Sequence, residues 1–215
     1  MEALVNYERI KKITEAQIGN PLNDLTDKEK ITLIAGHFEK IMQTLGLNLN
    51  DDSLNGTPNR VAKMYVKELF SGLRPENKPQ ISLFENKYGY HKMLVEKDIT
   101  LFSCCEHHFV PIIGKAHVAY IPHKQVIGLS KINRLVQYYA KRPQVQERLT
   151  IQIAEALKGI LQHDDVAVLI EADHLCVASR GIKDTNSQTV TSSYSGHFEN
   201  NDTRQEFLSY LNNKK

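Results

Sequence analysis

The chain has 215 residues, of which 41% are hydrophobic and 24% are charged, and its formal net charge is +2. Such a composition is typical of a folded globular protein with a sizeable core. The small net charge argues against a nucleic-acid or membrane-surface protein, which would gather basic residues on one face. The sequence shows neither a signal peptide nor an apolar run near the ~18 residues of a membrane span, so we expect a cytoplasmic protein with reduced cysteines.

The first third of the chain is predicted to be helical. Thr26 and Glu29 have the spacing of a capping box, and Gly46 is a typical helix stop. A second helix is expected to begin at Thr57, which is followed by a proline in the first turn, and to end at Gly72.

Strand-like patterns follow. Residues 80–104 are predicted to form two strands separated by a turn at residues 87–91, and residues 114–122 and 166–180 to form further strands. Two helices are expected in between, the first with Ser130 as its N-cap and the second with Pro143 in its opening turn, and Asn201-Asp202 to cap a last one. This order suits an α+β fold in which helices pack on one face of an antiparallel sheet.

The three cysteines, Cys104, Cys105 and Cys176, all lie close to histidines. Cys105 and His108 are three residues apart, which predicts a turn, whereas His174 and Cys176 are two apart and would share one face of a strand. Two thiolates and one imidazole, from Cys105, His108 and Cys176, suit a zinc ion and leave its fourth position open for water. A Cys-x-x-His pair alone would be equally compatible with core packing, but the third cysteine favours metal binding.

Charged residues near the starts of the two central helices suggest an anionic ligand. Lys131 and Arg134 would lie in the first turn after Ser130, where cations are disfavoured unless an anion such as phosphate binds. Glu147 either complements the next helix dipole or, if the ligand is a guanine nucleotide, accepts hydrogen bonds from its base. Arg180 would follow Cys176 on the same strand face if alternation continued.

The remaining histidines have no partner at a ligand-like spacing. We interpret them as surface residues or satisfied core residues: His37, His91, His117, His123, His163 and His197.

Seven runs of sequence, in order, resemble the GTP cyclohydrolase I family, and the resemblance extends from about residue 26 to the end. They are Thr-Pro-Asn-Arg-Val-Ala-Lys-Met-Tyr at 57–65, Cys-Glu-His-His-Phe at 105–109, Gly-Leu-Ser-Lys-Ile-Asn-Arg at 128–134, Arg-Pro-Gln-Val-Gln-Glu-Arg-Leu at 142–149, His-Leu-Cys at 174–176, Ala-Ser-Arg-Gly-Ile at 178–182 and Thr-Ser-Ser-Tyr-Ser-Gly-His-Phe at 191–198.

The resemblance implies the tunnelling fold (T-fold), in which antiparallel sheets from several subunits close a barrel with helices outside it. It also implies a toroidal homo-oligomer, usually a decamer, with active sites between subunits. Residues 1–75 would be an N-terminal helical region and residues 76–215 the catalytic domain. The implied reaction converts GTP and water into 7,8-dihydroneopterin triphosphate and formate, and involves neither nucleic acid nor a membrane.

The resemblance further implies a role for each candidate residue. Cys105, His108 and Cys176 would bind Zn²⁺, and His107 and His174 would be the acid/base groups. The triphosphate would be held by Lys63, Ser130, Lys131, Arg134 and Arg180, and the guanine by Gln146 and Glu147. Cys104, beside the expected ligand Cys105, is not a residue that the motif requires.

Other zinc proteins fit less well. A zinc nucleobase deaminase needs a Pro-Cys-x-x-Cys pair that the chain lacks. The GTP cyclohydrolase II class is disfavoured because its three-cysteine cluster is missing. A module with a structural zinc would leave His107 and His174 idle and would show a fourth ligand.

Overall fold

The computed structural model describes residues 25–212 of the chain. The predicted N-terminal helical region includes residues 1–24, which lie outside the described residues. Within residues 25–212, none of the helices combines the length and the apolar character that a membrane span requires.

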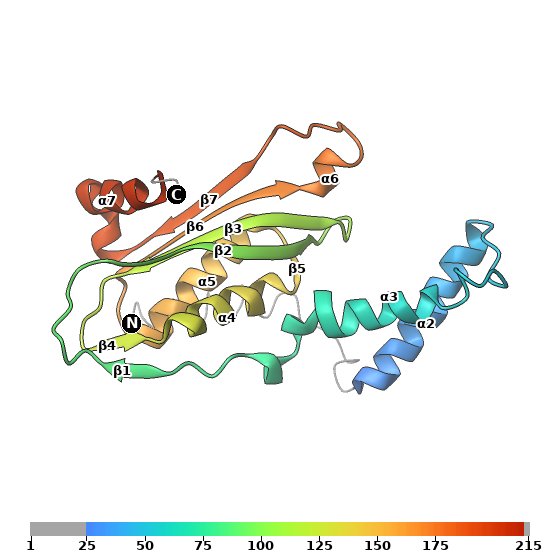
Figure 1. The fold of residues 1–215 in the computed structure, drawn as a ribbon, viewed down its shortest axis with the longest axis horizontal. Helices are drawn as coiled ribbons and strands as arrows, with labels where there is room; N and C mark the ends of the chain where they lie inside the picture. Colours follow the sequence, from blue (N-terminus) through green and yellow to red (C-terminus); the bar gives the residue numbers. More distant parts are fainter. Residues whose placement is uncertain (1–24, 213–215) are drawn as a thin grey trace, which may run out of the picture.

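A five-stranded sheet forms the centre of the fold (Figure 1). Its strand order is β5-β2-β3-β6-β7, with antiparallel pairs throughout except for the short parallel pair of β5 with β2. The strands are β2 (Leu94–Cys105), β3 (Pro111–Tyr120), β5 (Pro143–Gln144), β6 (Val166–His174) and β7 (Thr189–Tyr194). A separate ribbon pairs β1 (Leu83–Glu85) with β4 (Gln125–Ile127). The predicted antiparallel α+β architecture is therefore confirmed.

The N-terminal helices lie at one end of the sheet (Figure 1). They are α2 (Asp27–Thr44) and α3 (Thr57–Met64), and α3 continues as a π-helical turn at Tyr65–Leu69 and two 3₁₀ turns at Ser71–Leu73 and Pro75–Asn77. The predicted capping box is present, because Glu29 N–H donates to Thr26 Oγ1 and Thr26 N–H donates to Glu29 Oε2. Gly46, with φ of 78°, follows the end of α2 as predicted.

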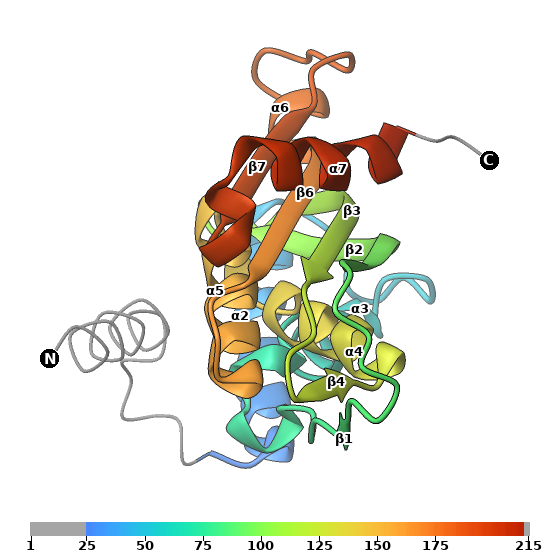
Figure 2. The ribbon, with the colours of Figure 1, turned by 90° about the vertical axis from the view of Figure 1, so that its left-hand side faces the viewer.

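Helices α4 (Leu129–Ala140) and α5 (Gln146–Leu161) cover one face of the sheet. Alternate residues of β6, such as Val168 and Ile170, point into that core, as a period of two requires. The intervening Ala167 and Leu169 face a second, smaller cluster that contains Phe207 of α7 (Asn201–Asn212). Figure 2 shows α7 lying across β6 and β7. Helices therefore pack on both faces of the sheet, and the prediction of helices on one face only is wrong, because α7 covers the face opposite to α4 and α5.

Three element boundaries differ from the prediction. Ser130 is not the N-cap, because α4 begins at Leu129 with Gly128 as its N-cap, and Ser130 lies inside the first turn. Pro143 lies in β5 and pairs with Cys104 of β2, so α5 opens at Gln146 instead. Asn200 rather than Asn201-Asp202 caps the last helix, since its Oδ1 accepts from Asp202 N–H at 2.8 Å.

A fourth correction concerns the strand expected at residues 166–180. The strand β6 ends at His174, and Leu175–Ala178 form a single helical turn, α6, closed by the bond from Ser179 N–H to Leu175 O. Cys176 and Arg180 therefore do not share a strand face. Strand alternation cannot direct their side chains.

Candidate metal centre and active site

The segment from Cys105 to His108 forms the predicted turn at the end of β2. Phe109 N–H donates to Cys105 O at 2.8 Å, and Cys105 N–H donates to Val110 O at 2.9 Å, so the turn is closed by backbone bonds. Phe109 adopts a left-handed φ of 52°, which lets the chain reverse within few residues. The backbone that carries the side chains of Cys105 to His108 is therefore held in one conformation.

Helix α5 and strand β5 hold this turn from outside. Glu106 N–H donates to Gln144 O at 3.0 Å, and the Glu106 carboxylate forms an ion pair with Arg148 of α5. Arg148 also donates from Nε to Gln144 Oε1 at 3.1 Å. This support gives no signal in the sequence, because Glu106 and Arg148 are 42 positions apart.

The end of β6 brings Cys176 to the turn. His174 is paired with Ile112 of β3, and β3 begins opposite Cys104 of β2, so the end of β6 lies next to the Cys105 turn. The helical turn α6 then returns Cys176 towards Cys105. The predicted proximity of the two cysteines is confirmed although the predicted strand is wrong.

Cys105, His108 and Cys176 form a group that could hold a metal ion, with one ligand atom of each within 4.8 Å of the others. Cys105 Sγ lies 3.9 Å from His108 Nδ1. Two such ligands on a tetrahedral zinc ion, with bonds of about 2.3 and 2.1 Å, would lie about 3.6 Å apart. The residues present therefore fit zinc in donor type and in spacing.

The electrostatics distinguish the cysteines. Burial and, to a smaller extent, the neighbouring Cys105 raise the pKa of Cys104 to about 11, so Cys104 stays a protonated thiol within the core. Burial and the contact with Cys105 also raise the pKa of Cys176, while the nearby Arg180 partly offsets both effects. Among the described residues, Cys104 is not part of the metal-binding group.

His174 is oriented by a buried amide. Its Nε2 lies 2.8 Å from Gln146 Oε1, and Gln146 is only 1% exposed. The Gln146 amide nitrogen donates to Ile170 O, Thr189 O and Thr191 Oγ1 at 3.0 to 3.1 Å. These three acceptors fix which end of the amide carries the oxygen. His174 Nε2 must therefore carry the hydrogen, and Nδ1 of the neutral ring is left as the basic nitrogen.

The pKa of His174 is lowered, chiefly by burial, although the charges of Glu147 and Asp173 act in the opposite direction. His107 differs from it in exposure, since 63% of its side chain is accessible. His107 Nδ1 nevertheless lies 3.7 Å from Cys105 Sγ. His107 therefore lies beside the metal group, and His174 ends β6 two residues before the candidate ligand Cys176.

The two predicted guanine residues have different surroundings. Both the nitrogen and the oxygen of the Gln146 side-chain amide are hydrogen-bonded to residues of the same chain, and the oxygen orients His174. Glu147 lies in the first turn of α5 and is exposed. Arg180, also exposed, lies close enough to Cys176 to affect its pKa.

The other predicted phosphate residues lie away from the metal group. Tyr120 stands at the far end of β3, about 30 Å along the strand from Pro111. Its hydroxyl accepts from Ile127 N–H, which anchors the start of α4 at that far end (Figure 1). Ser130 lies about 15 Å along the helix from Ala140, whose carbonyl oxygen accepts a hydrogen bond from Ser103 of β2. A single chain therefore does not bring Ser130 and Lys131 to the cysteines.

Arg134 is exposed one turn further along α4, and Lys63 is exposed on α3. The turn of α3 that follows Lys63 does approach the metal end, because Tyr65 contacts Phe109 with ring centroids 6.2 Å apart. Lys63 therefore lies on an element next to the metal group, whereas the start of α4 does not.

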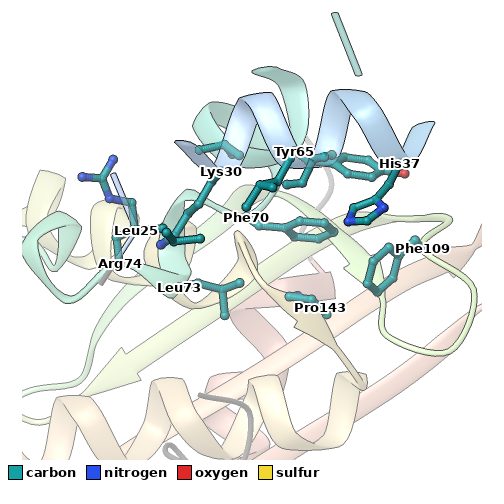
Figure 3. Close-up of a pocket in the computed structure, with 12 residues that line it drawn as sticks. Leu25, Lys30, His37, Tyr65, Phe70, Leu73, Arg74, Phe109 and Pro143 are labelled. Carbon is teal, nitrogen blue, oxygen red and sulfur yellow. The ribbon is translucent and has the colours of Figure 1, made fainter. Parts of the chain in front are cut away.

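An apolar pocket of about 540 Å³ adjoins the metal turn (Figure 3). The rings of Tyr65, Phe70 and Phe109 gather on one side of it, with centroids of Phe70 and Phe109 5.1 Å apart. Since Phe109 directly follows His108, this cluster packs the N-terminal helices against the metal turn. Among the lining residues of this pocket there is none of the predicted site residues.

Comparisons with known proteins match most of the chain to a single family. Residues 34–212 match the family model described as GTP cyclohydrolase I. A GTP cyclohydrolase 1 from Flavobacterium johnsoniae is 60% identical over 196 residues, which cover 89% of this chain and 88% of that protein. The GTP cyclohydrolase 1 of an Enterobacter species is 54% identical over 207 residues, covering 96% and 93%.

A solved structure, the archaeosine synthase QueF-Like in the apo form, covers 48% of this chain and 93% of its own. Its TM-score of 0.40 and 18% sequence identity are too low to support an argument about fold or function.

Proposed function

The chain belongs to the GTP cyclohydrolase I family, and on that premise we propose how its residues perform the reaction. It is a hydrolase that converts GTP and water into 7,8-dihydroneopterin triphosphate and formate, the first step of pterin and folate biosynthesis. The observation that carries the proposal is the convergence of two thiols and one imidazole beside a histidine whose tautomer is fixed.

Cys105, His108 and Cys176 would hold a zinc ion. This assignment is supported by the donor set and by the 3.9 Å between Cys105 Sγ and His108 Nδ1. When bound, zinc would supply Lewis acidity and lower the pKa of a water molecule towards about 7. Cys104, with its raised pKa and buried position, takes no part.

His174 would be the main general base. Because its Nε2–H is held by Gln146, the ring accepts a proton at Nδ1, and rotation of the ring is restricted. The burial that lowers its pKa keeps the ring neutral, which is the form that accepts protons. Gln146 acts here as a positioning residue.

His107 would supply the second acid/base function. Opening the imidazole ring of GTP at C8, releasing formate and closing the new ring require several proton transfers in both directions. An exposed histidine 3.7 Å from Cys105 Sγ is suited to exchange protons with solvent between these steps.

Glu147 and Arg180 would contact the substrate from the same chain. Glu147 follows Gln146 and can accept hydrogen bonds from the guanine N1–H and 2-amino groups, which adenine cannot donate. Arg180 and Lys63 would contact the triphosphate as cations.

Ser130, Lys131 and Arg134 would reach the triphosphate from a neighbouring subunit. Their position at the far end of the sheet from Cys105 supports an active site shared between subunits. We accordingly propose a toroidal homo-oligomer with the T-fold, of decameric size, in which the sheets of adjacent subunits continue around the ring. The division into a helical region and a catalytic domain at residue 76, and the cytoplasmic location, stay predictions from the sequence.

The test is to incubate the purified, zinc-loaded protein with GTP and to measure formate together with the fluorescence of oxidised neopterin. We expect both products in equal amounts, and neither with ATP. Glu147→Gln should weaken GTP binding by about tenfold or more, the loss that an unpaired charge-assisted hydrogen bond causes, without affecting zinc content. Absence of formate from the zinc-loaded parent protein would refute the assignment, and unchanged GTP affinity in Glu147→Gln would refute the guanine role alone.

A further inference from the structure

A second cluster of metal-binding side chains lies at the opposite end of β3 and β6 from the cysteines. His123 follows β3, and His163 and Asp165 lie between α5 and β6. One ligand atom of each lies within 4.8 Å of the others. The pairing of Tyr120 with Val166 places this cluster about 30 Å along β6 from His174. The two groups are therefore separate.

Asp165 is the centre of the cluster. Its side chain is only 7% exposed, and its Oδ2 lies 2.6 Å from His123 Nε2. Its Oδ1 accepts from the backbone N–H of His197 at 2.8 Å and lies 2.7 Å from His197 Nδ1. Three histidines from separate segments thus surround one buried carboxylate.

The close approach of His197 depends on Gly196, which has a left-handed φ of 56°. A Cβ atom at this position would come within 2.2 Å of Asp165 Oδ1. The chain therefore passes the carboxylate at a distance that only glycine permits.

One ring nitrogen of His163 is buried without a hydrogen-bond partner. This nitrogen is Nε2, while Nδ1 accepts a bond of 3.2 Å from Asp165 N–H. Its ring stacks on that of His123, with centroids 4.1 Å apart. A buried imidazole nitrogen without a partner is costly. Because Nδ1 accepts the bond from Asp165 N–H, the neutral ring carries its hydrogen on Nε2. For Nε2 to bind a metal ion, this hydrogen must move to Nδ1 and Asp165 N–H must give up its bond.

We propose that His123, His163 and Asp165 form a second site for a divalent transition-metal ion of the zinc type, with His197 holding the carboxylate from the other side. Two imidazoles and one carboxylate suit zinc, cobalt, nickel or copper and disfavour magnesium or calcium, which prefer oxygen ligands. The ion would join the loop after β3, the α5–β6 connection and the turn that leads into α7. Its role would be to tie these segments together, away from the chemistry at Cys105.

The side chains must rearrange slightly to bind. The rings of His123 and His163 are inclined by only 12°, so their in-plane lone pairs do not yet converge on one point. The His123 side chain is 48% exposed and can turn without disturbing the core. A surface pocket of about 490 Å³, lined by both histidines and Glu85, gives an ion access to the cluster.

The test uses the full-length protein equilibrated with zinc and freed of excess metal. We expect two equivalents of zinc per chain, and one equivalent in His123→Gln and in His163→Gln. His91→Gln, which changes a nearby histidine outside the cluster, should keep two and serves as the matched control. Turnover of GTP in His123→Gln should stay near that of the parent, because the cysteine site is untouched.

Cobalt identifies which site each ion occupies. A cobalt ion bound by Cys105 and Cys176 gives an intense thiolate-to-metal absorption, whereas one bound only by nitrogen and oxygen does not. The double variant Cys105→Ser/Cys176→Ser should therefore retain one cobalt without the thiolate band, and zinc should raise its unfolding temperature. Loss of all metal from this folded variant, or a single equivalent in the parent that His123→Gln does not reduce, would overturn the proposal.

Discussion

The two ends of the central sheet carry the two halves of the predicted active site in different ways. At the end of β2, His174 is fixed by Gln146 and the metal turn is fixed by Arg148, so that the chain itself orients the reactive groups. At the start of α4, Ser130 is exposed at the far end of the sheet from Cys105. Under the proposed function, one chain would prepare the metal and proton-transfer half, and association with a second chain would complete the phosphate half.

The largest effect is expected from removing a metal ligand. Cys176→Ser should lose the zinc ion of the cysteine site and reduce turnover by at least about a thousandfold, because two remaining ligands hold that ion poorly and its several kcal/mol of stabilisation disappear. Metal analysis and product formation are measured together. The matched control is Cys104→Ser, which should keep both zinc and activity; the reverse pattern would show that the wrong cysteine is assigned.

A smaller effect is expected at His174. His174→Ala should keep its zinc and bind GTP nearly as the parent does, while turnover falls by about 10²- to 10⁴-fold through loss of a general base. Zinc content, GTP affinity and single-turnover rate separate these effects. If the variant lost its zinc, His174 would be a fourth ligand and the metal end would be a closed structural site.

The smallest effect is expected from the residue that orients the base. Gln146→Met removes the acceptor for His174 Nε2–H and should lower turnover by about tenfold, since a net hydrogen bond contributes about 1 kcal/mol. The pH profile of turnover should change as well, because His174 is no longer confined to one tautomer.

Thr191→Val is the control for that variant, because it removes one partner of the same amide and leaves His174 untouched. Equal losses of turnover in the two variants, with an unchanged pH profile, would mean that Gln146 serves the fold and not the base.

Much of the fold and of the metal end could be predicted because the signals are local. The capping box of Thr26 and Glu29 and the turn from Cys105 to His108 depend on residues three apart, where spacing determines geometry. The helical turn after His174 could not be predicted, because the pattern around Cys176 fits the continuation of a strand equally well.

Long-range contacts gave no signal in the sequence. The sequence predicts surface or satisfied core positions for His123, His163 and His197, whereas the structure groups all three around Asp165. His123 is 42 positions from Asp165, and the pairing of β3 with β6 brings the two together, while His197 follows Asp165 by a further 32 positions. The support of His174 by Gln146, 28 residues away, was missed for the same reason.

The most direct test of the shared active site is a mixing experiment between two inactive variants. Cys176→Ser lacks the metal half and Lys131→Ala lacks part of the phosphate half, and each is purified, dissociated and reassembled alone or in an equal mixture with the other. If each site takes its two halves from different subunits, random mixing restores about a quarter of the parental activity, because half of the subunits can supply each intact half. If both halves come from one chain, the mixture stays as inactive as its components, which would contradict the account.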